Sequence, residues 1–156
     1  MIPICIFGND EDETLGQIIK KAISPFGTTV YNTDKHSDEM YDNCSFYIKE
    51  QEVCSNLKSP GGIAVFKKSF LPKEPVILPA DWVAIINSNH DKLKEQFCKT
   101  GQIVVTCGTK ATDTFSISSL DEIKPLSVCR ELNCNQWHCD RTLRNYNAYH
   151  KAVSSK

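Results

Sequence analysis

The sequence contains no long apolar run and no surplus of charge of one sign. No stretch approaches the ~20 consecutive apolar residues that a membrane-spanning helix needs. The 18 Lys and Arg residues are balanced by 19 Asp and Glu residues, so the net charge is −1. Proteins that bind nucleic acids or anionic membranes need a basic surplus. The sequence therefore predicts no nucleic-acid partner and no membrane partner.

The sequence also lacks the features of an exported protein. Its first residues, MIPICIFGNDEDE, carry no basic leader and soon turn acidic, which is not typical of a signal peptide. Most of the eight cysteines lie in apolar segments, as Cys5, Cys98 and Cys107 do. There a cysteine behaves as a small buried hydrophobe, whereas secreted disulfide scaffolds place cysteines in the loops of core-poor miniproteins. We expect free thiols and a cytoplasmic location.

Apolar segments alternate in type along the 156 residues, a length typical of one domain. The pattern predicts an amphipathic helix from Leu15 to Ile23, with Leu15, Ile18, Ile19, Ala22 and Ile23 on one face, and a second helix over 90–101. Strands are predicted at 4–7, 28–33, 46–50 (on a sheet edge), 63–68, 81–87 and 102–108. A terminal hairpin is predicted from 114–120 and 125–132, and 70–79, with three prolines, is a long connection.

This alternation predicts a single α/β domain over 1–156. Its sheet is mostly parallel and Rossmann-like or P-loop-like, is flanked by helices and ends in a C-terminal antiparallel hairpin. The first strand, the first helix and the second strand form a β-α-β unit, for which we expect parallel pairing. No structure is assigned to 133–156.

The junction between the first strand and the first helix has the outline of a phosphate-binding loop. A Walker-type loop needs glycines, a lysine for the phosphates and a Ser or Thr for magnesium. Here Gly8 and Thr14 are present, but the inner glycine and the lysine are replaced by the four acids of 10–13. Two like charges ~4 Å apart repel by about 4 kcal/mol at an effective dielectric constant of 20. The acids suit a free helix N-terminus instead, where they complement the helix dipole.

Two stretches resemble the central ATP-binding domain of the Mur ligases, which add amino acids to UDP-muramoyl precursors. They are IPICIFGNDEDETLGQIIKKAISPFGTTVYNTD and VAIINSNHDKLKEQF followed by GQIVVTCGTKATDTFSISSL, within roughly the first 120 residues. By this resemblance, Gly8, Asn9 and Thr14 match positions of the family's GTNGKTT-like loop. Asp12 or Glu13 then occupies the position of the family's catalytic lysine. The resemblance offers no match for the family's magnesium-binding glutamate or modified lysine. It implies a short stand-alone Mur-ligase-like protein of Firmicutes type, whose loop lacks the phosphate-binding lysine.

Polar residues follow two further strands at positions where α/β proteins bind ligands. The stretch 87–91 is also explained as a helix start capped by Ser88 or Asn89, and 107–113 as a polar connection. Alternatively, Thr109, Lys110 and backbone amides could hold a small anion. The candidate ligand-binding residues are Gly8, Asn9, Thr14, Asn87, Ser88, Asn89, His90, Cys107, Gly108, Thr109, Lys110 and Asp113.

A C-x4-C-x3-H-C array lies near the C-terminal end. Its residues Cys129, Cys134, His138 and Cys139 are possible zinc ligands, but the adjacent His138 and Cys139 cannot easily reach one tetrahedral ion together. We therefore expect no metal, with zinc binding as an alternative.

Taken together, the residues favour a non-catalytic binding or regulatory module with no cofactor and an unknown protein or small-molecule partner. The first alternative is a small enzyme, or a nucleotide- or small-ligand-binding protein, that uses 87–91 and 107–113. The second is a zinc-dependent interaction module.

Overall fold

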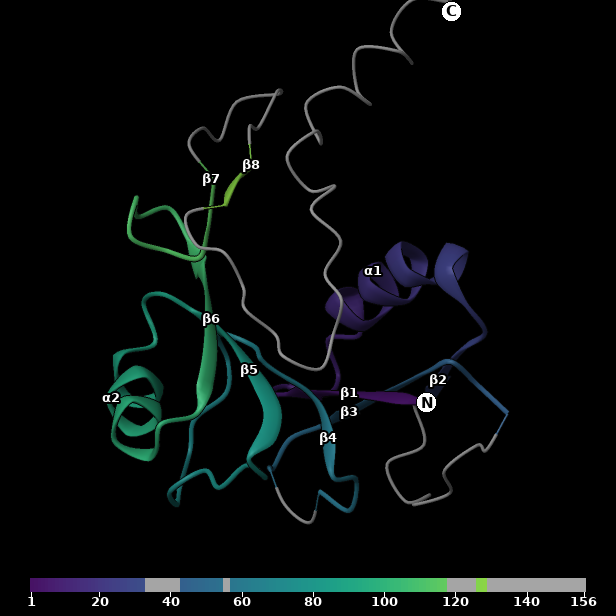
Figure 1. Cartoon of the computed structure of the whole chain (residues 1–156), viewed down its shortest axis with the longest axis horizontal. Coiled ribbons are helices and arrows are strands. Elements are labelled where there is room, and N and C mark those ends of the chain that lie inside the picture. The colour runs from purple at the N-terminus through teal and green to yellow at the C-terminus, as the bar shows by residue number, and fades with distance from the viewer. Residues whose placement is uncertain (33–42, 55–56, 118–125, 129–156) are drawn as a thin grey trace, which may run out of the picture.

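A computed structural model describes residues 1–32, 43–54, 57–117 and 126–128 of the chain (Figure 1). Eleven elements lie in these ranges. The strands are β1 (Ile2–Phe7), β2 (Thr29–Asn32), β3 (Phe46–Gln51), β4 (Gly61–Phe66), β5 (Asp81–Asn87), β6 (Ile103–Gly108), β7 (Phe115–Ile117) and β8 (Leu126–Val128). The helices are α1 (Thr14–Ile23), the 3-10 helix η1 (Ser24–Phe26) and α2 (Asp91–Thr100).

All eight strands form one sheet in the order β2-β3-β1-β4-β5-β6-β7-β8. The first seven strands of this order run parallel, and β8 pairs antiparallel with β7. The prediction of an α/β fold with a mainly parallel sheet is confirmed. The rest of the predicted hairpin, at 118–125 and 129–132, lies outside the described residues.

Strand β3 corrects two features of the prediction. It lies inside the sheet, in parallel register with β1 on one side and β2 on the other, and not on an edge. The expected pairing of β1 with β2 is therefore also wrong: both run parallel in the same sheet, but β3 lies between them. Strand β3 carries charged residues at its end, Lys49 and Glu50, as edge strands often do. In the fold Glu50 is nevertheless only 6% exposed, because a lysine from elsewhere pairs with it.

Two hydrophobic clusters pack on opposite faces of the sheet, as the alternation along β1 shows. Ile4 and Ile6 belong to the cluster under α1, whereas Cys5 and Phe7 belong to the cluster that includes α2. Figure 1 shows the two helices well separated, on either side of the strands. The α2-side cluster also holds the buried aromatic side chains Phe66, Phe70, Trp82 and Phe97.

The apolar face of α1 is rotated from the predicted one. Leu15, Ile19 and Ile23 pack on the sheet, but Ile18 is 59% exposed and Ala22 is also exposed. Gly16 is instead the buried residue of this helix. The rotation brings the Gly16 backbone close to Glu50 of β3 and Tyr31 of β2, where a Cβ would overlap the glutamate carboxylate.

The second predicted β-α-β unit is present as β5, α2 and β6. Strands β5 and β6 pair in parallel, and α2 ends at Thr100, directly before Gly101, whose φ of 68° is left-handed. The segment 67–80 contains no strand, as its prolines predicted. None of the described helices is long and apolar enough to cross a membrane.

Candidate functional site

The carboxyl ends of β1, β3 and β4 meet at a topological switch point of the sheet. Strands β1 and β4 are neighbours, but the chain leaves β1 toward β2 on one side and leaves β4 toward β5 on the other. Ligands of open α/β sheets bind in the crevice that such diverging connections leave. The connection from β1 to α1, residues 8–13, lies at this point and is called loop 8–13 below.

Lys67 holds loop 8–13 from within. It follows β4 directly, and its side chain is 7% exposed. Its Nζ donates to the carbonyl oxygen of Asn9 at 2.7 Å, to the carbonyl oxygen of Asp12, and to Glu50 Oε2 at 2.8 Å. An ammonium group has three protons, so these contacts use all of them. Lys67 therefore has no proton left for a ligand.

These contacts give loop 8–13 the opposite polarity to a phosphate-binding loop. A phosphate-binding loop points backbone N–H groups at an anion. Here the carbonyl oxygens of Asn9 and Asp12 converge on a cation that belongs to the chain itself. An anion in this position would face carbonyl oxygens and displace a buried ammonium group.

Three N–H groups of the loop also donate to acceptors inside the chain. Gly8 N–H donates to the Gln51 carbonyl at 3.2 Å, and Asn9 N–H to Ser69 Oγ at 3.0 Å. Glu11 N–H donates to Asn9 Oδ1 at 3.1 Å. Donors that wrap a phosphate elsewhere are thus already hydrogen-bonded here.

Helix α1 begins at Thr14, after the acidic residues. Its first turn contains none of them, and Glu13, the residue before the helix, makes no side-chain capping hydrogen bond. Of the four acids, Asp12 bonds the helix start, because its Oδ1 accepts the Thr14 N–H at 3.1 Å. Hydrogen bonds from the Thr14 side chain and backbone lower the pKa of Asp12. Asp12 thus bonds the helix start directly, and the predicted interaction of the other acids with the helix dipole stays a prediction.

Glu50 links Lys67 to a crowded contact with α1. A Cβ on Gly16 would overlap Glu50 Oε1 and would lie 2.7 Å from the Tyr31 hydroxyl oxygen. Burial raises the pKa of Tyr31, and the charge of Glu50 raises it further. The ion pair, the tyrosine and the helix backbone form one buried polar unit behind loop 8–13.

A groove of about 730 Å³ opens beside this unit, at the same edge of the sheet. It is lined by residues 8–11 after β1, 52–54 after β3 and 69–76 after β4. Its charged lining residues are the acids Asp10, Glu11, Glu52 and Glu74 and a single base, Lys73. The volume lies within the roughly 300–1,000 Å³ of typical small-ligand sites. We call it the carboxyl-edge groove.

The structure also brings the two other predicted loops together, at the carboxyl ends of β5 and β6. Ser88 N–H donates to the Cys107 carbonyl at 2.9 Å, and a Cβ on Gly108 would meet Ser88 Oγ and Asp113 Oδ2. Ser88 is 2% exposed, and its Oγ has no hydrogen-bond partner in the described part of the chain. Burial raises the pKa of the Cys107 thiol, and Asp113 raises it further.

Asp113 limits what this second cluster can bind. It is 3% exposed, and its Oδ2 accepts the Lys110 N–H at 3.0 Å. The loop thus already holds a carboxylate of its own where a small anion was considered. Thr109 and Lys110 are exposed.

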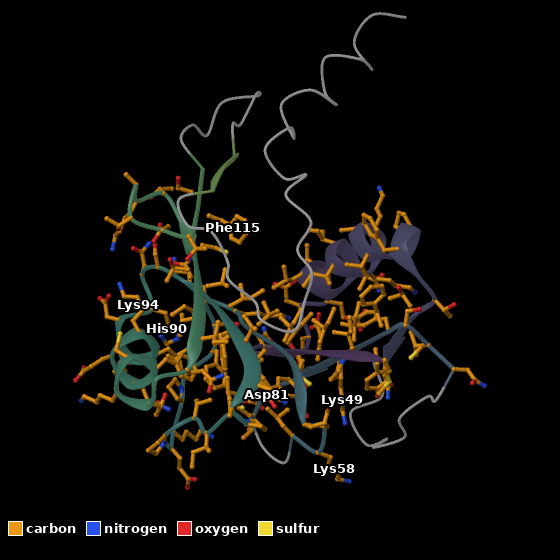
Figure 2. All side chains as sticks on the ribbon, viewed as in Figure 1. Lys49, Lys58, Asp81, His90, Lys94 and Phe115 are labelled. Atoms are coloured by element: carbon orange, nitrogen blue, oxygen red, sulfur yellow. The ribbon has the colours of Figure 1, made fainter. Side chains whose placement is uncertain are left out.

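The remaining predicted residues lie near the start of α2. His90, not Ser88 or Asn89, precedes the helix, and no side chain caps it. Asn87 Oδ1 accepts the Asn89 N–H at 2.9 Å, and this hydrogen bond closes a turn over 87–89 before the helix begins. His90 Nε2 lies 2.8 Å from the Phe70 carbonyl oxygen, on the α2 side of the sheet with Lys94 (Figure 2).

Of the residues predicted from the sequence, Gly8 and Asn9 line the carboxyl-edge groove, whereas Thr14 begins α1. Sequence reasoning missed Lys67 and Glu50. Glu50 pairs in register with Ile6 of the central strand β1, and a charge at such a position needs a buried partner. That requirement would have pointed to the lysines after β4, had β3 been placed inside the sheet.

Among the described residues, no group of three or more His, Cys, Asp and Glu side chains could hold a metal ion, and Cys5, Cys54, Cys98 and Cys107 are free thiols. The alternative zinc ligands Cys129, Cys134, His138 and Cys139 lie outside the described residues. Comparisons of the chain with protein-family models, with curated proteins and with solved structures give no match.

Proposed function

We propose that this chain is a non-catalytic binding or regulatory module that does not use nucleotides. In this proposal the chain is related by ancestry to the Mur-ligase central domain and has kept the α/β scaffold. The observation that carries the proposal is the contact of Lys67 Nζ with two carbonyl oxygens of loop 8–13.

Energetics support the same conclusion. To accept a triphosphate, the loop would have to withdraw two carbonyl oxygens from Lys67 and turn N–H groups away from their present acceptors. Leaving a buried donor or acceptor without its partner costs about 1–3 kcal/mol, and more for a charged group. The acids at 10–13 would add repulsion to that cost. A shared fold does not carry a shared activity, so ancestry alone does not argue for ligase chemistry.

Calorimetric titration with Mg·ATP tests this proposal. We expect no saturable heat at millimolar ATP and no release of phosphate over hours. Micromolar binding followed by turnover would contradict it. A control titration with Mg²⁺ alone separates nucleotide binding from binding of the cation to the acidic loop.

A second candidate function is small-ligand binding between 87–91 and 107–113. The specific observation is the buried Ser88 Oγ beside Gly108 and Asp113, which has no hydrogen-bond partner among the residues that the structure describes. Because an unsatisfied buried hydroxyl costs free energy, a bound ligand that completes its hydrogen bonding would stabilise the fold. A thermal-shift screen of neutral polar metabolites tests this, with Ser88→Ala as the control: a real ligand raises the melting temperature of the wild type and not of the variant.

A further inference from the structure

We propose that the carboxyl-edge groove binds a basic, apolar peptide segment of a partner protein. This inference rests on the proposed function, since it names the class of ligand that such a binding module takes. It is carried by the charge and the exposed apolar surface of the groove.

The charge of the groove favours a cation. Four carboxylates and one lysine line it, although the whole chain has a net charge of only −1. Glu11, Glu52 and Glu74 are exposed, and none of them forms an ion pair with another described residue. A partner with lysine or arginine side chains would therefore gain attraction without having to break existing pairs.

The apolar surface of the groove favours a peptide over a small, fully polar cation. Val53 is 58% exposed and Leu71 is 79% exposed, and they project from two different loops that line the groove. Ile77, next to the lining segment 69–76, is 85% exposed. Exposed apolar surface with a polar rim is typical of interaction sites. Their spread over two loops suits a peptide with several side chains.

The same groove disfavours anions. The N–H groups of Gly8, Asn9 and Glu11, which border it, already donate to acceptors within the chain. Lys67, the neighbouring buried cation, uses its three protons internally. Lys73 is the only charged donor side chain among the lining residues.

Selection from a random dodecapeptide library displayed on phage tests this proposal. The purified full chain is the target, and the variant Glu52→Lys/Glu74→Lys serves for counter-selection. We expect the recovered peptides to combine lysine or arginine with large apolar residues. Synthetic versions should lose affinity about tenfold or more for that variant, and also on raising the salt from about 0.05 to 0.5 M.

Matched variants locate the effect. Asp81→Lys/Glu95→Lys makes the same change of charge at exposed positions outside the groove. Asp81 is the first residue of β5, whereas the groove lies at the carboxyl edge of the sheet (Figure 2). We expect this variant to bind as the wild type does. Leu71→Ser should weaken binding, whereas Ile18→Ser, an exposed position on α1, should not.

Four results would each overturn the inference: failure to enrich any peptide, enrichment of acidic peptides, equal loss with the two charge-reversal variants, or equally tight binding of spermine, a cation without apolar side chains. The absence of peptide binding together with the absence of Mg·ATP binding would refute this inference alone. Tight Mg·ATP binding would refute the proposed function.

Discussion

Removal of the Lys67 side chain tests the buried polar unit behind loop 8–13. The substitution Lys67→Met keeps the aliphatic length and removes the ammonium group, which leaves Glu50, 6% exposed, buried without its cation. Breaking a buried pair in this way costs about 3–5 kcal/mol. At about 2–4 °C per kcal/mol for a chain of this size, the melting temperature should fall by about 6–20 °C.

Urea denaturation followed by far-ultraviolet circular dichroism measures this loss. Lys68→Met is the matched control, because Lys68 is exposed and adjacent in sequence; its effect should stay within about 0.5 kcal/mol. The double variant Lys67→Met/Glu50→Leu removes both charges and leaves only the two loop carbonyls without their donor. It should lose about 1–3 kcal/mol, which is less than either single variant loses.

Two results would refute this reasoning. A loss below about 1 kcal/mol in Lys67→Met would mean that the ammonium group contributes little to stability. Additive losses in the double variant would mean that Lys67 and Glu50 are not coupled. If Lys67→Met fails to fold, recovery of folding in the double variant still reports the coupling.

Three further predictions concern neighbouring groups. Gly16→Ala should destabilise the fold, because the new Cβ would meet Glu50 and Tyr31. In an ordinary helix the same change stabilises by about 1 kcal/mol. Chemical denaturation measures the effect, and a gain in stability would contradict the prediction. The pKa of Tyr31 is raised in the folded state, so its protonated form contributes stability below the ordinary tyrosine pKa of about 10, and this stability is lost as the pH rises. Tyr31→Phe should therefore make the decline of stability at alkaline pH shallower. An unchanged pH profile would argue against the burial of Tyr31 beside Glu50. Burial raises the pKa of Cys5 to about 12, whereas Cys98 is exposed, so mass-spectrometric mapping of iodoacetamide labelling should find Cys98 modified first and Cys5 protected until unfolding; early labelling of Cys5 would contradict its burial.

The sequence patterns with a clear period predicted the fold well. Strand β5 has the predicted bounds, and α2 ends at Thr100, directly before the glycine that was expected to end it. Both segments have strong local features: an apolar run in β5 and a left-handed glycine after α2. In addition β5 and β6, which are consecutive strands in the sequence, are neighbours in the sheet. The three prolines of 70–79 likewise ruled out a strand by purely local chemistry.

The position of β3 could not be read from local pattern. Its insertion between β1 and β2 depends on pairing between distant segments, and its charged end is compatible with the interior only because Lys67 arrives from β4. For the same reason the sequence indicated which phosphate-binding residues loop 8–13 lacks, but not that Lys67 contacts the carbonyl oxygens of the loop. A missing lysine is visible locally, whereas a lysine that comes from 55 positions away is visible only in the fold.

Loop 8–13 itself offers the most direct test of the central claim that Lys67 closes it to phosphate. Backbone amide resonances of Gly8, Asn9, Glu11 and Thr14 can be followed by nuclear magnetic resonance while Mg·ATP is added. Because these N–H groups donate inside the chain, three to acceptors in the loop and its neighbours and Thr14 to Asp12, we predict no saturable change in their chemical shifts. Saturable shifts at these amides would show that the loop opens and binds phosphate, and would contradict the account.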